Sequence, residues 1–352
     1  MATLASAWAD RGDDVSLVTL DARGQDFHTL SPKVARVRLD VVRPSATRLH
    51  ALLRQRKTRR TIADAILPTS ADVVLSFLTI CNVLVLGALA GRGVPVVVSE
   101  RIVPEFLSHP WWRYQRRRWY PTASAVVVQS ASLLDWAGTI APRAHRFAIP
   151  NPVLPPAIAK PEVALRAGGP VMAIGRLDPQ KGFDLLLRAF AGAIPRLPPA
   201  DCRRLVIVGQ GAERERLMRL ADSLGVGDRI ELAGERKDVA SLLAGASLLV
   251  SSSRREGFPN VLLEAMAAGL AVIATDCPGA TREIVRHGID GVVVPSGDVG
   301  ALADALVRLL IDSDERARLG REAVSVLDRF GLPRILAAWD RAFATTIGNR
   351  ER

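Results

Sequence analysis

The chain has 352 residues, 49% hydrophobic and 24% charged, a composition that suits one or two ordinary globular domains and excludes a disordered or fibrous protein. Its cysteines, Cys81, Cys202 and Cys277, lie far apart, which argues against a disulfide framework or a zinc site and indicates a reducing compartment. Residues 1–150 hold +9 of the net charge of +11, so the excess of positive charge belongs to the first half of the chain.

The first residues predict the end of a helix followed by a strand. In MATLASAWADRGDDVSLVTL, the apolar residues from Leu4 to Trp8 have helical spacing, and RGDD ends the helix before DVSLVTL. A doubly wound parallel domain begins one step earlier, with a central strand and a turn. We therefore expect a first domain that lacks its first strand, with a natural reading frame that starts upstream. The alternative is a reorganised sheet that begins at DVSLVTL.

Two segments of the first half concentrate positive charge. They are RQRKTRR at 54–60 and HPWWRYQRRRWYP at 109–121, where five aromatic residues alternate with four arginines. Arginines are attracted to anionic headgroups and amphipathic rings rest at the membrane interface. Residues 109–121 thus predict contact with an anionic membrane surface, and a solvated helix face is the alternative. Nucleic acid is disfavoured because no binding motif accompanies the charge. We expect a cytoplasmic protein, peripheral on the inner face of the cell membrane if this contact forms.

An uncharged run at 73–91, VVLSFLTICNVLVLGALAG, approaches the length of a membrane-crossing helix. Polar residues and a glycine interrupt it, and it divides into a β-rich run, a short turn and a helix-like run. We therefore expect a buried strand and helix here rather than a membrane span.

Strand-like and helix-like runs alternate along the chain, which indicates parallel α/β sheets. The segment 149–170, IPNPVLPPAIAKPEVALRAGGP, has six prolines and reads as a linker. We expect a Rossmann-like domain at 1–150, a linker at 151–169, a second Rossmann-like domain at 170–330 and a terminal helix within 331–352. Open parallel sheets bind ligands at the carboxyl ends of their strands, so a cleft between the domains is the predicted site.

The segment GRLDPQKGFDLLLRAF follows the strand VMAI. Gly175 permits a turn close to a ligand, and Arg176 and Lys181 place two cations at the carboxyl end of that strand. Such cations fit a diphosphate, and an ordinary charged loop is the alternative. The later segment VGQGAERERL has Arg214 where a dinucleotide fingerprint has its third glycine, which disfavours a dehydrogenase.

Glu256 and Glu264 lie eight positions apart in SRREGFPNVLLEAMAAG. Pro259 marks the start of a helix and Gly269 its end. A helix N-terminus in a cleft suits a phosphate, which two carboxylates would repel if they touched it. We therefore expect the glutamates to accept hydrogen bonds from hydroxyls on the two sides of a diphosphate, as a sugar nucleotide provides.

Four successive segments resemble the motifs of the family 4 retaining glycosyltransferases of the GT-B fold, of which E-x7-E is the signature. They are GRLDPQKGFDLLLRAF, VGQGAERERL, SSSRREGFPNVLLEAMAAGLAVIATDCPGATREIV and GVVVPSGD. The resemblance implies an α/β protein with two Rossmann-like domains facing a cleft. It also implies transfer of a hexose from a nucleotide diphosphate sugar, UDP favoured, to a hydroxyl of a polysaccharide or lipid-linked glycan. The alternative is a non-catalytic nucleotide-sugar or glycan binder of the same fold, inactive through N-terminal truncation.

The resemblance also assigns residues. Arg176 and Lys181 would hold the diphosphate, Glu264 the ribose and Glu256 the donor sugar, and the implied catalytic group is Glu256, Arg176 and Lys181. The other implied donor-binding residues are Gly175, Arg236 beside the base, and the backbone of Gly257, Phe258, Pro259, Asn260, Val261 and Leu262. The final helix at 332–343 would cross back to the first domain.

Four segments of the first domain resemble a bacterial subgroup that acts on polysaccharide or lipid-linked acceptors. They are SFLTICNVLVL, VVVSERIVP, YPTASAVVVQS and IPNPV. Its Glu-Arg-Asn triplet is here Glu100, Arg101 and Ile102, so Glu100 and Arg101 are the implied acceptor-side residues and the amide is missing. Arg176, Lys181 and the helix dipole would stabilise the leaving diphosphate with no metal or other cofactor. We assign Asp312, in IDSD, to a helix cap rather than a metal site.

Overall fold

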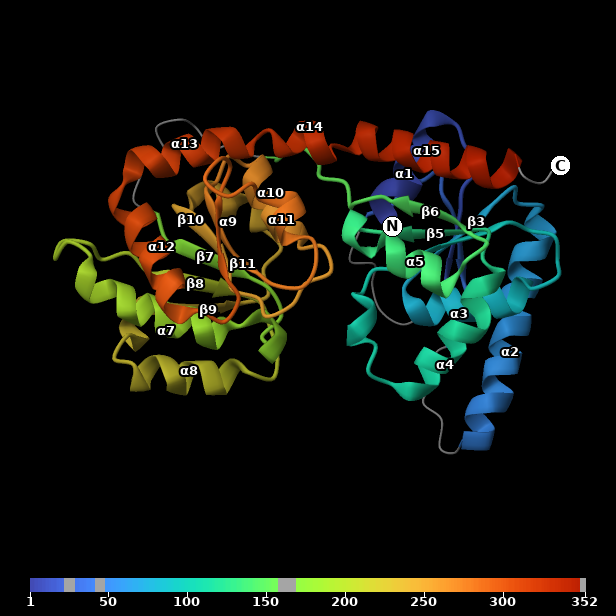
Figure 1. Ribbon diagram of the computed structural model, residues 1–352, viewed down its shortest axis with the longest axis horizontal. Helices are drawn as coiled ribbons and strands as arrows, with labels where there is room; N and C mark the ends of the chain where they lie inside the picture. The colour runs from blue at the N-terminus through green and yellow to red at the C-terminus, as the bar shows by residue number, and fades with distance from the viewer. Residues whose placement is uncertain (22–28, 42–47, 158–168, 349–352) are drawn as a thin grey trace. The chain divides into compact units, whose positions relative to one another are not determined.

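The computed structural model describes residues 1–21, 29–41, 48–157 and 169–348 (Figure 1). Most of the predicted linker, residues 158–168, lies outside these ranges. Contacts between Cα atoms divide the chain into two compact units, residues 1–149 with 336–352 and residues 150–335. Each unit has its own parallel sheet, which confirms the predicted α/β class.

The first unit alternates short strands with helices. Its strands are β1 (Ser16–Thr19), β2 (Ala35–Arg38), β3 (Val74–Phe77), β4 (Val96–Ser99), β5 (Ala125–Val128) and β6 (His145–Ala148). Its helices are α1 (Ala2–Arg11), α2 (Arg48–Ile66), α3 (Thr79–Leu89), α4 (Pro110–Trp119) and α5 (Leu134–Ile140), with 3-10 turns that include η2 (Pro104–Phe106) and η3 (Tyr120–Thr122). Strands β3 to β6 form a parallel sheet in chain order, and β1 and β2 form a separate parallel pair. The helix and strand predicted at the start are α1 and β1, and the expected preceding strand stays a prediction.

The uncharged run at 73–91 forms β3 and α3, as predicted. Asn82, on α3, donates to the carbonyl oxygen of Ser99 at 3.1 Å and to the hydroxyl of Tyr120 at 3.0 Å, which joins the helix to the sheet. No helix in the described ranges is long and apolar enough to cross a membrane.

The last helix, α15 (Leu332–Gly348), belongs to the first unit from Leu336 on. Trp339 is fully buried there and packs edge-on against Trp8 of α1, with ring centroids 6.2 Å apart. Arg11 forms two hydrogen bonds with the carboxylate of Asp340, at 2.7 and 2.8 Å. These contacts fix the terminal helix on α1.

The second unit is built on a six-stranded parallel sheet in the order β12-β11-β10-β7-β8-β9. The strands are β7 (Val171–Ile174), β8 (Leu205–Val208), β9 (Ile230–Gly234), β10 (Leu248–Ser251), β11 (Val272–Asp276) and β12 (Val292–Pro295). The helices are α7 (Phe183–Ala193), α8 (Arg214–Ser223), α9 (Val239–Gly245), α10 (Asn260–Ala267), α11 (Thr281–Ile284), α12 (Val299–Ile311), α13 (Ser313–Ala323) and α14 (Val326–Phe330). Successive strands run outward from β7 to β9 and then from β10 to β12, so the order reverses between β7 and β10. Ligands of such sheets bind at this reversal.

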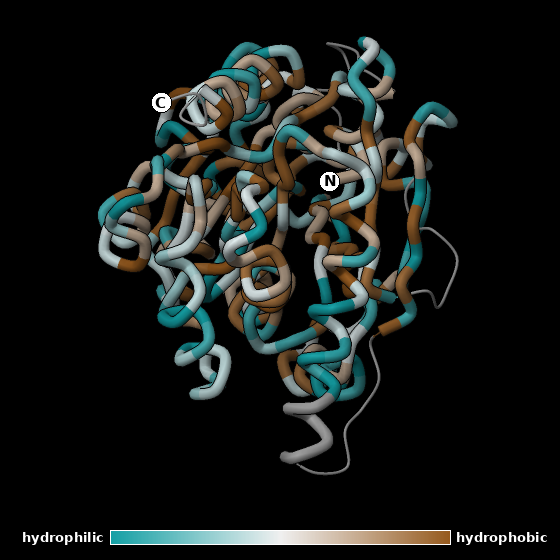
Figure 2. The backbone as a smooth tube through the Cα atoms, turned by 90° about the vertical axis from the view of Figure 1, so that its right-hand side faces the viewer, coloured by the Kyte–Doolittle hydropathy of each residue, from teal (hydrophilic) through white to brown (hydrophobic). Residues whose placement is uncertain are grey.

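Two hydrophobic cores cover the two faces of this sheet. Val171 and Ala173 face one core, with α7, α8 and α12, whereas Met172 between them faces the other, with α9, α10 and α14. This alternation follows from the two-residue period of a strand. Figure 2 shows hydrophilic and hydrophobic stretches alternating along the backbone, as expected for helices with one buried side.

Candidate functional site

The reversal of strand order places the loop after β7 beside the loop after β10. Gly182, in the first loop, has a φ of +63°, and a Cβ atom there would overlap the carbonyl oxygen of Ser252 in the second. Gly279, after β11, has a φ of +136° and would in the same way overlap the carbonyl oxygen of Glu256. Glycine therefore permits three loops to pack backbone against backbone.

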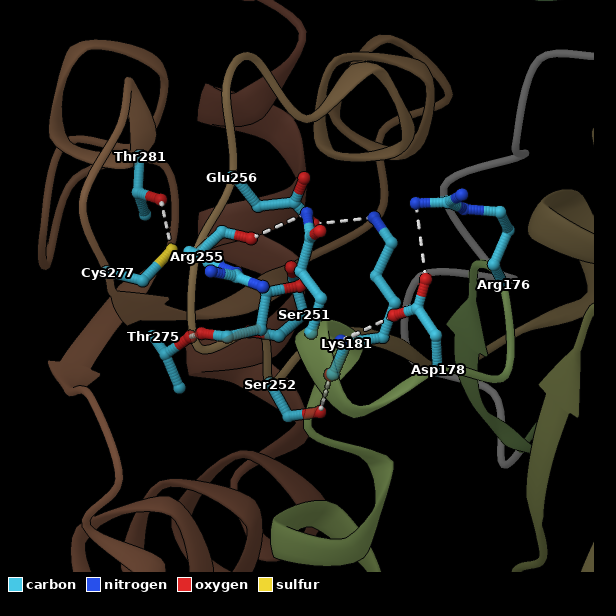
Figure 3. Close-up of polar contacts among 12 residues, drawn as sticks. Arg176, Asp178, Lys181, Ser251, Ser252, Arg255, Glu256, Thr275, Cys277 and Thr281 are labelled. Atoms are coloured by element: carbon cyan, nitrogen blue, oxygen red, sulfur yellow. Dashed lines mark hydrogen bonds and ion pairs between the residues drawn. The ribbon is translucent and has the colours of Figure 1, made fainter. Parts of the chain in front are cut away.

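A lysine and a glutamate meet across the first two loops. Lys181 Nζ lies 2.6 Å from Glu256 Oε1 (Figure 3). Ser253 donates its hydroxyl to the same oxygen at 2.6 Å. The side chains of Lys181 and Glu256 are 18% and 9% exposed. This is a mostly buried ion pair with a hydrogen bond, the geometry that a buried carboxylate requires.

The backbone around Lys181 is also fixed. The carboxylate of Asp178 caps the 3-10 turn η5 (Pro179–Lys181) by accepting from the Lys181 N–H at 3.3 Å. Ser252 donates its hydroxyl to the Lys181 carbonyl oxygen at 3.0 Å, as Figure 3 shows. The ammonium group is therefore held where β7 ends, as the sequence predicted for a cation of this loop.

Arg176, the second predicted cation, is far more exposed. Its guanidinium is 3.2 Å from the carboxylate of Asp178, and its side chain is 74% exposed. Figure 3 shows it turned toward Asp178. Such an exposed ion pair holds an arginine only weakly, so Arg176 is able to turn toward a ligand.

Glu264 lies in the second turn of α10, five residues after Pro259. Its side chain has no hydrogen bond or ion pair with any residue in the described part of the chain. It is exposed to solvent, yet partial desolvation by the surrounding protein raises the pKa of its carboxyl. A desolvated carboxylate without a protein donor is suited to accept hydrogen bonds from a ligand.

The other predicted donor-binding residues divide into two groups. Phe258 and Leu262 are buried, and Phe258 packs edge-on against Phe330, with ring centroids 5.8 Å apart, so their side chains belong to the core. The binding of a ligand by the backbone of 257–262 stays a prediction. Arg236, after β9, forms two hydrogen bonds with Asp238, which raise the pKa of its guanidinium, and its role toward a base stays a prediction.

Sequence reasoning missed the supports of these loops. Arg254 holds the carboxylate of Asp184 in α7 through two hydrogen bonds at 2.7 and 2.8 Å, and this pair lowers the pKa of Asp184. Thr275, at the end of β11, donates to the carbonyl oxygen of Ser253 at 2.5 Å. Gly209, after β8, lies against the carbonyl oxygen of Gly175, so a glycine permits these two loops to pack closely. In the sequence, these supporting contacts were indicated by no more than the polar run SSSRR at 251–255.

Glu100, a predicted acceptor-side residue, lies in a buried network. Its carboxylate accepts from the hydroxyls of Thr79 and Tyr120, both at 2.6 Å, and its side chain has no solvent exposure. It therefore joins the end of β4 to α3 and η3, and the structure shows no surface through which it would touch an acceptor. Arg101 stacks on the ring of Phe77 at 4.3 Å, and burial lowers its pKa to about 9. Its predicted acceptor role stays a prediction.

Two further predictions concern a metal and a membrane. Asp312 caps α13 by accepting from the N–H groups of Asp314 and Glu315, which confirms its assignment to a helix cap. In residues 1–21, 29–41, 48–157 and 169–348, no group of His, Cys, Asp and Glu is arranged to hold a metal ion. The basic segment 109–121 forms α4 and η3, and its contact with a membrane stays a prediction.

Comparison with known families gives matches to both halves of the chain. Residues 1–154 match the model described as Glycosyltransferase Family 4, and residues 169–312 match Glycosyl transferases group 1. A Campylobacter jejuni enzyme, named as an α-1,4-N-acetyl-D-galactosaminyltransferase acting on a diNAcBac-PP-undecaprenol glycan, is 26% identical over 98% of this chain and 93% of its own length. A Streptomyces coelicolor protein named exopolysaccharide phosphotransferase is 36% identical over 66% of this chain, which spans only 24% of that relative.

Solved structures show the same fold. Sucrose-phosphate synthase from Thermosynechococcus elongatus aligns over 99% of this chain and 92% of its own, with a TM-score of 0.82 and 21% identity. Anabaena HepE, in complex with UDP and glucose, aligns over 97% and 94%, with a TM-score of 0.75 and 20% identity. At these identities the likeness concerns the fold.

Proposed function

Because the chain belongs to the family 4 glycosyltransferases and has their GT-B fold, we propose that it retains the anomeric configuration of the sugar it transfers. The donor is a nucleotide diphosphate hexose, with UDP as the favoured nucleotide, and the acceptor is a hydroxyl of a polysaccharide or lipid-linked glycan. The names of the relatives support these classes. One is named as a transferase acting on an undecaprenol-linked glycan, and another was solved in complex with UDP and glucose.

The observation that carries the proposal is the ion pair between Lys181 and Glu256. Glu264 follows in α10 and has no hydrogen bond or ion pair in the described part of the chain. An ammonium group has three N–H donors, and Glu256 occupies one of them, so the others are available for a diphosphate. Glu264 would accept hydrogen bonds from the two ribose hydroxyls, and Glu256 from a hydroxyl of the hexose. In this proposal Lys181 meets the diphosphate, and the two glutamates meet hydroxyls on its two sides.

In the proposed reaction, the bond between the anomeric carbon and the diphosphate oxygen breaks while the acceptor oxygen bonds to the same face of that carbon. The acceptor proton passes to the departing diphosphate. Lys181 and Arg176 stabilise the negative charge that develops on the leaving group, and the carboxylate of Glu256 favours the positive charge on the sugar ring. This account assigns no step to a metal or to another cofactor.

Donor identity and turnover are measured together in one experiment. The purified chain is mixed with a panel of nucleotide diphosphate sugars, and its melting temperature and the release of nucleoside diphosphate are recorded. We expect stabilisation and release with a UDP-hexose, and retention in the product by nuclear magnetic resonance of the anomeric proton. Binding without release, with glycan and lipid-linked acceptors present, would favour the non-catalytic alternative.

We also propose that α4 places this enzyme on an anionic membrane surface. Trp111 and Tyr114 are exposed on this helix with ring centroids 6.0 Å apart, and Arg113, Arg117 and Arg118 are exposed beside them. Aromatic rings that rest at the interface and arginines that attract anionic headgroups form the combination that such surfaces bind.

A further inference from the structure

A cavity lies within the first unit, between η2, α4 and α5. Its volume is about 420 Å³. Its lining includes Pro104 and Glu105 of η2, Arg113, Arg116 and Arg117 of α4, and Trp136 of α5. Three arginines and one glutamate give this lining a formal charge of +2.

The three arginines share one face of α4, because positions 113, 116 and 117 are spaced by three and four residues. Arg116 is the buried member, at 7% exposure. It donates to the carbonyl oxygen of Pro104 at 3.3 Å, and its guanidinium lies 4.9 Å from the ring centroid of Trp136. Its Nε–H is buried with no acceptor in the described part of the chain. Arg116 therefore lines the cavity as a cation held in place by Pro104 and Trp136.

The carboxylate nearest to Arg116 only partly offsets this charge. Glu100 Oε2 is 4.0 Å from Arg116 Nη1. Burial raises the pKa of Glu100, although hydrogen bonds from Thr79 and Tyr120 and the charge of Arg116 act in the opposite direction. A carboxyl that is harder to ionise neutralises its neighbour less.

Arg113 and Arg117 supply exposed charge at the same cavity. Neither has an ion pair with a carboxylate in the ranges that the structure describes, and Glu105 lies beyond ion-pair distance of both. Several exposed arginines of the second unit do have such partners, for example Arg216 with Glu213 and Arg308 with Glu315. The charge at this cavity therefore remains available to a ligand.

We propose that this cavity binds a phosphate or diphosphate group. Its volume lies in the range of small-molecule sites, and guanidinium groups recognise phosphate oxygens through paired hydrogen bonds. Trp136 offers an apolar wall to the part of the ligand that carries the phosphate, and Glu105 would accept from a hydroxyl of the same ligand. The phosphate is the head of a lipid or a free phosphorylated compound. The site is built from residues of the first unit alone, and none of them is a proposed donor-binding residue.

Calorimetric titration of the full chain with inorganic pyrophosphate tests the site. Because pyrophosphate would also meet Arg176 and Lys181, the titration uses the R176Q/K181Q variant as its background. We expect this variant to bind pyrophosphate, and R113Q/R117Q in the same background to bind it roughly tenfold or more weakly for each arginine lost. The control is R118Q, which removes a neighbouring charge that stacks on Trp119 outside the cavity.

Vesicles separate the two sources of the phosphate. If the ligand is a lipid head, the chain binds phosphatidic acid vesicles better than phosphatidylglycerol vesicles of equal surface charge, and R113Q/R117Q removes the preference. If the ligand is free, pyrophosphate binds but neither vesicle is preferred. Unchanged pyrophosphate binding in R113Q/R117Q, or an equal loss in R118Q, would overturn the proposal. Arg113 and Arg117 are exposed, and equal melting temperatures of the variants would show that the fold is intact.

Discussion

Lys181 Nζ lies 2.6 Å from Glu256 Oε1 and so joins the loop after β7 to the loop after β10. The two side chains neutralise each other in a mostly buried position. Removing either partner alone leaves the other without its counter-charge, whereas removing both does not. This difference makes the pair measurable in both stability and catalysis.

The Lys181→Met variant should lose about 2 to 3 kcal/mol of unfolding free energy, because Glu256 would lose its counter-charge and keep Ser253 as its one partner among the described residues. Glu256→Gln should cost less, since the amide keeps the shape of the side chain. The double variant should be more stable than Lys181→Met alone, which urea denaturation of the four proteins measures as a coupling energy. Strictly additive losses would show that the pair does not contribute to stability.

Glu256→Gln should lower kcat by a larger factor than it raises the donor dissociation constant. The proposed carboxylate contact strengthens as positive charge develops on the sugar ring, so its loss falls mainly on the transition state. Steady-state kinetics combined with calorimetric titration separates the two effects. Equal factors would assign Glu256 to ground-state binding.

Glu264→Gln should weaken donor binding by roughly 1.5 to 3 kcal/mol, the range for hydrogen bonds to a charged acceptor. In the wild type, donor affinity should fall as the pH drops through the raised pKa of the free carboxyl, because its protonated form accepts fewer hydrogen bonds. Calorimetry at neutral and mildly acidic pH measures this. A Glu264→Gln variant with wild-type affinity at neutral pH would place the ribose elsewhere.

The same carboxyl affects stability with the opposite sign. A folded-state pKa above the unfolded value means that ionised Glu264 costs folding free energy, and this cost disappears as the pH falls through the folded pKa. Glu264→Gln should therefore be slightly more stable than the wild type at neutral pH, with the difference lost in acid. A gain in stability alongside a loss of affinity is the pattern of a ligand-binding group rather than a structural one.

Gly182→Ala should destabilise the second unit by roughly 3 kcal/mol, because it adds an overlap with the Ser252 carbonyl oxygen to the cost of a left-handed backbone. Gly225→Ala is the matched control. Its φ of +70° is similar and no atom lies within 4 Å of the added carbon, so it should cost only about 1 to 2 kcal/mol. Equal losses in thermal or urea unfolding would mean that the two loops separate easily.

Transferase activity should survive treatment with EDTA, because Lys181 and Arg176 are the proposed charges on the leaving diphosphate. Loss of activity that Mg²⁺ or Mn²⁺ restores would contradict this account. The measurement is nucleoside diphosphate release before and after chelation.

Binding to anionic vesicles should weaken with salt, since exposed charges are screened over about 10 Å at 0.1 M ionic strength. The R113Q/R117Q/R118Q variant should lose this binding. A control that removes three exposed arginines from the second unit, R216Q/R219Q/R308Q, should keep it. Equal binding of the wild type to neutral vesicles would leave α4 as an ordinary solvated helix.

The sequence indicated the two loops of the candidate site but not the contacts that support them. Lys181 and Glu256 both follow apolar strand runs, and parallel strands bring such positions to one edge of a sheet, so their proximity was predictable. The pairing of Arg254 with Asp184 spans 70 residues, and nothing in the local pattern indicates it. Glu100 shows the opposite case. The family resemblance implied that Glu100 lies on the acceptor side. The burial of Glu100 depends on Tyr120 and Thr79, which reach it from other elements.

The strand order of the second unit has a consequence for how this protein folds. Strand β10 pairs directly with β7, yet β8 and β9 come between them in the chain and lie on the far side of β7. The pairing of β7 with β10 therefore closes a long loop, and such non-local pairing is slow compared with the formation of helices. Lys181 and Glu256 meet only once that closure is complete. In a refolding experiment, recovery of donor binding should consequently lag behind the return of helical signal, and the lag would report the time taken to join the two halves of the sheet.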